Sequence, residues 1–382
     1  MIARRPRIAV LANTLERGAG PDAGGHVHFL EIVQRWTWAD IVIFAPESGR
    51  IPFLHRVSRA AFVAMPSCDG LVENKAAQFL FRAVAGLSMW KELRRCDALV
   101  STSHGLPDVL PAIVFRRRRG LVIVHHLIDT AKHRNGPPVR NMIAFAAERV
   151  SLAIAARTFG AVACSSKLAA ASLRNLGFKQ PIVITTSGVD HIERPSGASA
   201  PRTGAVFVGR LHPTKGVDDL VRAWRLVADA LPEARLTLIG ASDDREFERQ
   251  LDALIAILGL RDNVLKLGRV PDDVKDACLY AARAFAFPSK EEGWGIALAE
   301  AMRAGLPAVT YALPVFDEIF PRGRLSSPIA DVGAFATNLI RILTDDELHA
   351  RLAEEASSLA EGFTWQQAAD AEASALRALI SR

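Results

Sequence analysis

Two glutamates flank a glycine-containing turn in the stretch SKEEGWGIALAEAMRAGLP, residues 289–307. Glu292 precedes an expected helix, and Glu300 lies about two turns along it. The glycines of the turn would let the backbone approach a ligand closely. Because free carboxylates are poor neighbours for phosphates, we expect these two side chains to bind hydroxyl groups. The alternative is that both are ordinary charges on a helix surface.

Two cations lie in a second turn, within VFVGRLHPTKGVDDL, residues 206–220. A strand is expected to end at Gly209, the turn carries Arg210 and Lys215, and a helix begins near Val217. Two positive side chains beside free helix-terminal amides suit a diphosphate. An ordinary strand-to-helix turn with exposed basic residues is the other interpretation. A ligand with a central diphosphate and hydroxyl-rich ends would use both stretches, which describes a nucleotide sugar.

Short β-branched runs alternate with helical patterns along the whole chain, which predicts doubly wound parallel α/β structure. Strands are expected in the first half at 7–12, 40–46, 97–103, 121–126, 161–166 and 181–188. The second half contains the strand-like runs AVFVGR, RLTLIG, VLKLGR, AFAFPS and PAVTYA.

The stretch ERPSGASAPRTG, residues 193–204, is poor in large apolar residues and predicts a linker. We therefore expect two Rossmann-like domains facing a central cleft, with ligands at the carboxyl ends of the strands. Residues 1–190 would bind the acceptor and residues 204–362 the nucleotide sugar, with a linker at 191–203. The final helix, 363–382, is expected to pack back on the first domain.

Composition limits the class of protein and its location. The chain has 382 residues, half of them apolar, which excludes global disorder. Four scattered cysteines without a C-x-x-C pair indicate a reducing cytoplasm rather than a disulfide framework. No run approaches the roughly 20 apolar residues of a membrane span, and the N-terminus is better explained as a first strand than as a signal peptide. We expect a cytoplasmic protein, at most peripheral at a membrane.

Charge is divided unevenly between the two halves. Residues 1–190 carry 25 Lys and Arg against 13 Asp and Glu, whereas the remainder carries 22 against 28. A basic first half suggests an anionic partner. No aromatic-studded basic module supports nucleic acid. An anionic lipid surface or plain solubility remain, with Arg116–Arg119 and the amphipathic stretch FLFRAVAGLSMWKELRR as candidate contacts. The same stretch could instead pack on the core.

GRLHPTKG, followed by FPSKEEGWGIALAEAMRAGLPAV, resembles the C-terminal domain of retaining glycosyltransferases of family 4, which have the GT-B fold. Weaker matches are an early loop that contains Gly24 and Gly25, the LVIVHH strand, ITTSGVD and the terminal FTW. The resemblance implies transfer of a sugar from a nucleotide diphosphate sugar with retention of configuration.

The resemblance also implies roles for individual residues. Glu292 would contact hydroxyls of the donor sugar and Glu300 the ribose. Arg210 and Lys215 would neutralise the diphosphate, whose departing charge is the main electrostatic problem of the reaction. His125 would lie beside the transferred sugar. The other residues implied at the donor are Gly24, Gly25, Gly209, Arg269, Val270, Gly293, Trp294, Gly295 and Ile296.

No D-x-D triplet occurs in the chain, and no histidine or cysteine has zinc-like spacing. We therefore expect no metal and no cofactor beyond the donor, two basic residues taking the place of a metal. The acceptor would be a saccharide or a lipid-linked saccharide in cell-envelope or polysaccharide synthesis. Ser187 stands where the family has Asn, which leaves base and acceptor preference open. A nucleotide-sugar epimerase and a non-catalytic nucleotide-sugar-binding protein are the alternatives.

Overall fold

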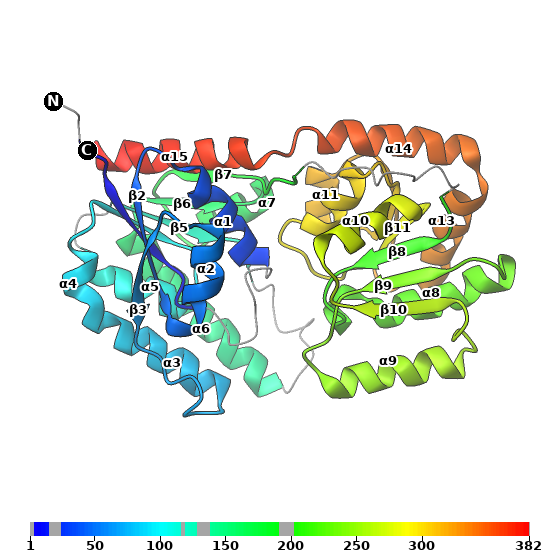
Figure 1. The fold of residues 1–382 in the computed structure, drawn as a ribbon, viewed down its shortest axis with the longest axis horizontal. Helices are drawn as coiled ribbons and strands as arrows, with labels where there is room; N and C mark the ends of the chain where they lie inside the picture. Colours follow the sequence, from blue (N-terminus) through cyan, green and yellow to red (C-terminus); the bar gives the residue numbers. More distant parts are fainter. Residues whose placement is uncertain (1–3, 15–23, 116–118, 128–137, 191–201, 382) are drawn as a thin grey trace. The chain divides into compact units, whose positions relative to one another are not determined.

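The computed structural model describes residues 4–14, 24–115, 119–127, 138–190 and 202–381. The chain divides into two compact units (Figure 1). Unit 1 comprises Met1–Gly188 with Trp365–Arg382, and unit 2 comprises Val189–Thr364. Most of the predicted linker, residues 191–201, lies outside the described residues, as do residues 116–118 of the predicted arginine cluster.

Unit 1 contains a seven-stranded sheet whose order is β3-β2-β1-β4-β5-β6-β7, with every neighbouring pair parallel. Its strands are β1 (Arg7–Leu11), β2 (Asp40–Pro46), β3 (Ala61–Met65), β4 (Ala98–Ser101), β5 (Gly120–Val124), β6 (Ala161–Cys164) and β7 (Ile182–Ile184). Its α-helices are α1 (Gly24–Arg35), α2 (Arg50–Arg56), α3 (Lys75–Ala85), α4 (Trp90–Leu93), α5 (Leu106–Val109), α6 (Pro138–Thr158), α7 (Lys167–Asn175) and α15 (Trp365–Ile380).

The two faces of this sheet are buried in two separate cores. Ile8 and Val10 of β1 pack with α1 and α15, whereas Ala9 and Leu11 belong to the cluster on the opposite face. Successive strand residues point to opposite faces, so a strand that is apolar at every position requires helices on both sides. The indole of Trp36 donates a 3.0 Å hydrogen bond to the Ala369 carbonyl, which fastens α15 to unit 1.

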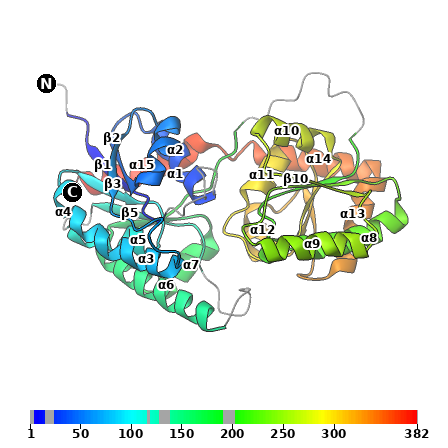
Figure 2. The same cartoon turned by 60° about the horizontal axis from the view of Figure 1, so that its bottom comes forward.

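Unit 2 contains a six-stranded parallel sheet in the order β10-β9-β8-β11-β12-β13. Its strands are β8 (Ala205–Val208), β9 (Leu236–Ile239), β10 (Val264–Gly268), β11 (Ala284–Phe287), β12 (Ala308–Tyr311) and β13 (Arg324–Ser327). Its α-helices are α8 (Val217–Ala230), α9 (Arg245–Ile257), α10 (Asp272–Ala281), α11 (Ile296–Arg303), α12 (Pro314–Ile319), α13 (Val332–Thr344) and α14 (Asp346–Ala360). Figure 2 shows α8 and α9 along one side of this unit.

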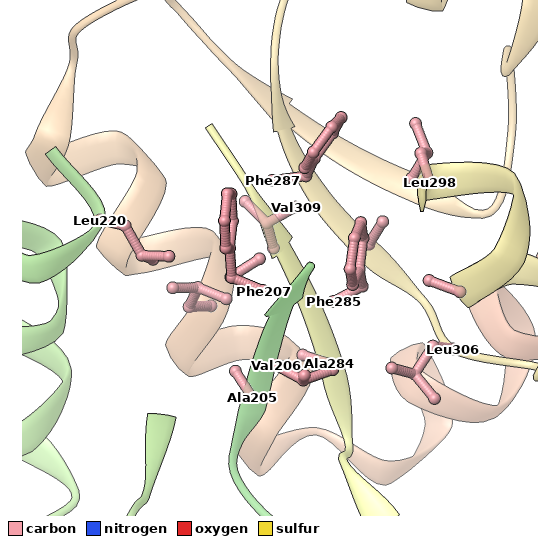
Figure 3. Close-up of a cluster of buried hydrophobic side chains, with 14 of the residues drawn as sticks. Ala205, Val206, Phe207, Leu220, Ala284, Phe285, Phe287, Leu298, Leu306 and Val309 are labelled. Atoms are coloured by element: carbon pink, nitrogen blue, oxygen red, sulfur yellow. The ribbon is translucent and has the colours of Figure 1, made fainter. Parts of the chain in front are cut away.

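The core of unit 2 is built on its two central strands. Phe207 of β8 lies 6.1 Å from Phe287 of β11, and Phe287 lies 5.3 Å from Phe285, measured between ring centroids. Figure 3 shows these three rings among the aliphatic side chains of the same cluster. Rings that bury this much apolar surface fix the two strands that precede the turns carrying Arg210 and Glu292.

The predicted α/β alternation is confirmed, with two strands missed. Both β3 and β13 lie at the outer end of a sheet, and β13 has the sequence RLSS, which contains no apolar run. Gly24 and Gly25 were expected in a loop, but they form the first turn of α1.

Candidate functional site

The order of the strands in unit 2 reverses between β8 and β11, which is a common position for a ligand site. From β8 the chain continues to β9 on one side, whereas β11 continues to β12 on the other. Parallel sheets bind ligands at the carboxyl ends of the two strands that flank such a reversal. The two stretches singled out in the sequence follow these two strands, so the fold brings them together.

A backbone contact holds the two turns together. Gly216, between the 3-10 turn Pro213–Lys215 and α8, has a φ of +65°, and a Cβ there would lie 2.1 Å from the Pro288 carbonyl oxygen. The backbone amide of Lys290 donates a 2.8 Å hydrogen bond to the Thr214 carbonyl. Glycine is therefore required both by the backbone conformation and by the closeness of the neighbouring turn.

An ion pair joins Lys215, which is predicted to bind phosphate, to Glu292, which is predicted to bind the sugar. Lys215 Nζ lies 2.5 Å from Glu292 Oε1, and both side chains are mostly buried, with 17% and 11% exposed. Arg210 is exposed and has no salt bridge among the described residues. The turn after β8 thus carries one cation held by a carboxylate and one that faces solvent.

Asp219 on α8, which the sequence did not indicate as a site residue, contacts the turn after β11 through its side chain. Its Oδ2 accepts a 2.9 Å hydrogen bond from the Tyr311 hydroxyl and lies 2.8 Å from Lys290 Nζ. Asp219 and Tyr311 are both buried. In the sequence Asp219 looks like an ordinary acidic residue of a helix N-terminus, because its partners lie far along the chain.

Glu300 has a lysine partner that the sequence did not indicate. Lys275 Nζ on α10 lies 3.0 Å from Glu300 Oε1 and 3.1 Å from Asp272 Oδ1. Burial raises the pKa of Glu300, and the charge and hydrogen bond of Lys275 oppose that rise. Burial disfavours the charge on Lys275, but Glu300 and Asp272 outweigh it and raise the lysine pKa. The pair places a carboxylate and an ammonium group together in a partly buried position.

The Gly-Trp-Gly turn directs its one large side chain into the core. Gly295 has a φ of +112° and caps the N-terminus of α11. The Trp294 ring lies 5.4 Å from the ring of Phe320 and 5.2 Å from that of Phe363, and the residue is 5% exposed. At 293–296 only main-chain groups and the half-buried Ile296 are therefore available, and Trp294 acts as an anchor.

His212 is a further residue of this turn that the sequence reading did not single out. Its Nδ1 accepts hydrogen bonds from the Thr214 amide at 3.2 Å and hydroxyl at 2.8 Å. Burial, and then the charges of Arg210 and Lys215, lower the pKa of His212. The ring is therefore neutral, and its proton resides on Nε2.

The remaining donor residues expected in unit 2 lie at the same edge of the sheet. Gly209 follows β8, and its amide donates a 3.0 Å hydrogen bond to the Ile239 carbonyl. Arg269 and Val270 follow β10, which is separated from β8 by β9. Arg269 is exposed, whereas Val270 packs partly against the core.

Comparison with known proteins shows a likeness that is confined largely to unit 2. The family model described as Glycosyl transferases group 1 matches residues 190–359. Those residues are therefore similar to the members of that family. The phosphatidyl-myo-inositol mannosyltransferase of Mycobacterium leprae is 28% identical over 196 residues, 47% of this chain and 51% of that protein. The D-inositol 3-phosphate glycosyltransferase of Xylanimonas cellulosilytica is 35% identical over 172 residues, 44% of this chain and 40% of that protein. The chain thus spans about half the length of these relatives.

Solved structures extend the likeness to the whole fold. Anabaena Alr3699/HepE, crystallised in complex with UDP and glucose, aligns with a TM-score of 0.78 at 17% identity and covers 98% of this chain and 100% of its own. The chain has the GT-B fold that the sequence resemblance implied.

Unit 1 places the predicted His125 directly after β5, beside a second histidine. His125 Nε2 donates a 2.9 Å hydrogen bond to the Thr102 carbonyl, and its ring lies 5.2 Å from that of His28. Burial, and then the neighbouring His28, lower the pKa of His125 to about 3. His125 is therefore neutral near pH 7, with Nδ1 as its hydrogen-bond acceptor.

His28 is a structural residue. Its Nε2 donates a 2.8 Å hydrogen bond to Glu372 on α15, and its Nδ1 lies 3.4 Å from the Ser187 hydroxyl. All three side chains are buried. Ser187, which departs from the family pattern, thus has a partner inside unit 1.

A buried aspartate organises the carboxyl ends of β1 and β4, where the strand order of unit 1 reverses. Asp108 accepts hydrogen bonds from the amide of Asn13 at 2.5 Å, the hydroxyl of Thr14 at 2.8 Å and the hydroxyl of Ser103 at 2.5 Å. Burial raises the pKa of Asp108 to about 6, against the opposing effect of these donors. Its contacts lie within the protein, so we interpret it as structural.

Metal-binding clusters and membrane-spanning helices are both absent from the described part of the chain. There, no group of three or more His, Cys, Asp or Glu side chains is arranged to hold a metal ion. Within the same ranges no helix has the length and apolarity needed to cross a bilayer. None of the four cysteines forms a disulfide.

Proposed function

We propose that the chain is a retaining, metal-independent glycosyltransferase that moves a sugar from a nucleotide diphosphate sugar to a saccharide or lipid-linked acceptor. The observation that carries the proposal is the Lys215–Glu292 pair at the strand reversal of a domain similar to group 1 glycosyltransferases. The names of the relatives add mannosyl and inositol-phosphate chemistry, so mannosyl donors are the first to test.

The diphosphate would be bound by the turn after β8. Arg210 is exposed and can meet a phosphate directly, whereas Lys215 must share its charge between the phosphate and Glu292. Negative charge grows on the leaving diphosphate as the glycosidic bond breaks, and fixed cations in a partly dry site stabilise it. The amide groups at the start of α11 add donors at the same edge.

The two glutamates would fix the ends of the donor. Glu300, paired with Lys275, can accept hydrogen bonds from two adjacent ribose hydroxyls. Glu292 can accept one from a sugar hydroxyl through the oxygen that does not meet Lys215. A neutral His125 would act as a hydrogen-bond acceptor toward the transferred sugar, because its lowered pKa excludes an acid role near neutrality.

We further propose that the protein works in cell-envelope or polysaccharide synthesis as a cytoplasmic protein peripheral at a membrane. Support comes from the basic first half of the sequence and from relatives named for phosphatidyl-inositol and O-antigen chain acceptors. No cofactor other than the donor enters this scheme.

The test is a donor panel that varies base and sugar, with and without membrane or polysaccharide extract, following nucleotide release and sugar incorporation. Acceptor-dependent transfer with the anomeric configuration kept is the expected result. An isomerised sugar released without acceptor would instead show an epimerase, and binding without turnover a non-catalytic protein. Lys215→Ala should reduce kcat/KM by about 100-fold or more. Lys266→Ala is the matched control, since that lysine pairs with Asp252 in the same unit.

A further inference from the structure

Helix α3 exposes apolar side chains and buries an arginine, which is the reverse of an ordinary surface helix. Arg82 and Ala83 face inward, and Arg82 is paired with Asp69 in a largely buried salt bridge. Outward, Leu80, Phe81 and Val84 are 57%, 45% and 55% exposed. An amphipathic helix of a globular protein normally turns its apolar side to the core. The sequence of α3 thus directs its apolar side toward something outside unit 1.

Helix α6 exposes a second apolar stripe next to it. Met142, Ile143 and Val150 are 62%, 63% and 54% exposed, at a spacing that places them on one side of the helix. Both α3 and α6 pack against α5, and Figures 1 and 2 show them side by side. We call the exposed residues Leu80, Phe81, Val84, Met142, Ile143 and Val150 the α3–α6 face. Scattered apolar residues need no explanation, but two exposed apolar stripes on helices that pack against the same element are more than scattered residues, and we interpret them as an interaction site.

The border of this face is basic and carries an aromatic side chain. Besides the buried Arg82, residues 75–95 contain four Lys or Arg and one acidic residue, Glu92. Trp90, 41% exposed, lies with its ring centroid 5.5 Å from Lys91 Nζ and 5.1 Å from the Arg94 guanidinium carbon. Arg157, near the end of α6, is also exposed. An apolar stripe flanked by Trp and basic residues complements a bilayer, with its acyl boundary and anionic headgroups.

We propose that the α3–α6 face docks unit 1 on an anionic bilayer surface, with α3 lying in the plane of the interface. Leu80, Phe81 and Val84 enter the boundary between headgroups and acyl chains, while Lys91 and Arg94 meet lipid phosphates. A second copy of the chain is the weaker candidate, because pairing two such faces would bring together their basic borders. The inference rests on the proposed function in that it names the surface behind the proposed peripheral location at a membrane, where a lipid-linked acceptor would be reached.

The experiment is flotation of the full chain with vesicles of phosphatidylcholine alone or mixed with phosphatidylglycerol, without donor or acceptor. We expect binding to the mixed vesicles and its loss as salt rises. Leu80→Asp and Phe81→Asp should each weaken binding about tenfold or more. The matched control is Ile257→Asp on α9 of unit 2, an 81% exposed apolar residue that should leave binding unchanged.

Variants that remove basic side chains of the border test the contacts with lipid phosphates separately from the insertion of apolar side chains. Lys91→Gln and Arg94→Gln should each weaken binding to the mixed vesicles about fivefold, with Arg249→Gln, on α9, as the control. Binding of wild type and Phe81→Asp to equal extent would overturn the inference. So would a lipid-free dimer that Phe81→Asp dissociates, combined with no vesicle binding. Vesicle binding by a chain that transfers no sugar would uphold the docking surface and remove the proposed function.

Discussion

Lys215 on the turn after β8 and Glu292 on the turn after β11 form an ion pair with 2.5 Å between Nζ and Oε1. The pair links these two turns through opposite charges. A diphosphate that approaches Lys215 must compete with Glu292 for the ammonium group. In the proposed site Glu292 would therefore act on both parts of a nucleotide sugar, attracting hydroxyl groups and opposing phosphate.

Replacing Glu292 by Gln should have opposite effects on two ligands. Free nucleoside diphosphate should bind as tightly as to wild type or a few-fold more tightly, because Lys215 loses a competing carboxylate. Transfer from the full donor should fall by about 100-fold, because a charged acceptor to the sugar hydroxyl is lost. Calorimetric titration with nucleoside diphosphate and initial rates with the donor measure the two effects.

Glu248→Gln on α9 is the control, since it removes a carboxylate that lies 3.5 Å from Lys266 in the same unit. It should leave both measurements near wild type. Weaker binding of free nucleoside diphosphate by Glu292→Gln would show that Glu292 positions Lys215 for phosphate rather than competing with phosphate.

The sequence was sufficient for the elements that carry Glu292 and Glu300 because their signals are local. A buried run such as AFAF predicts a strand, and the glycines before IALAEAMR predict the helix start, which the structure places at Ile296. Edge strand β13 could not be found in this way, since it is stabilised by pairing with β12 and not by its own apolar residues.

The partners of the site residues could not be predicted because they depend on tertiary packing. Lys275 lies in DDVKDA, a stretch typical of a solvated helix, yet the side chain reaches Glu300 on another helix. Trp294 was expected to offer its backbone amide to the donor, and the sequence did not indicate that its ring packs against Phe320 and Phe363. Residue type and spacing indicated the ligand, whereas the three-dimensional contacts decide which groups are available to it.

Removing the charge of Lys275 should shift the pH dependence of activity. Burial raises the pKa of Glu300, and Lys275 opposes that rise, so Lys275→Met should raise this pKa further. If ionised Glu300 binds the ribose, activity is present above its pKa and is lost as pH falls through it. The acid limb of kcat/KM should therefore move to higher pH in Lys275→Met, with activity partly recovered at alkaline pH.

Lys275→Arg, which keeps the charge, should retain the wild-type acid limb, and Lys266→Met should serve as a control for the loss of a lysine elsewhere in unit 2. A uniform loss of activity at every pH in Lys275→Met would contradict the titration of Glu300 and indicate damage to the packing of α10 on α11.

Two glycines with the same backbone conformation offer a matched test of the contact between the two turns. Gly216 and Gly259 have φ values of +65° and +66°, but a Cβ at Gly259 meets nothing within 4 Å, whereas one at Gly216 meets the Pro288 carbonyl at 2.1 Å. Gly259→Ala should lower the free energy of unfolding of unit 2 by about 1–2 kcal/mol, the cost of the left-handed conformation. Gly216→Ala should lower it by a further 1–3 kcal/mol or so, because the backbone at Pro288 must move.

Displacing Pro288 should also affect donor binding, which a loss of stability elsewhere in unit 2 should not do. Pro288 leads into the segment that carries Glu292, so Gly216→Ala should separate Glu292 from Lys215 and weaken donor binding. Gly259→Ala should leave donor affinity unchanged, because it lies in the turn after α9. Denaturant unfolding and donor titration at a temperature where both variants are folded separate the two effects. Equal donor affinity in the two variants would show that the turns tolerate displacement and that their contact does not position the site.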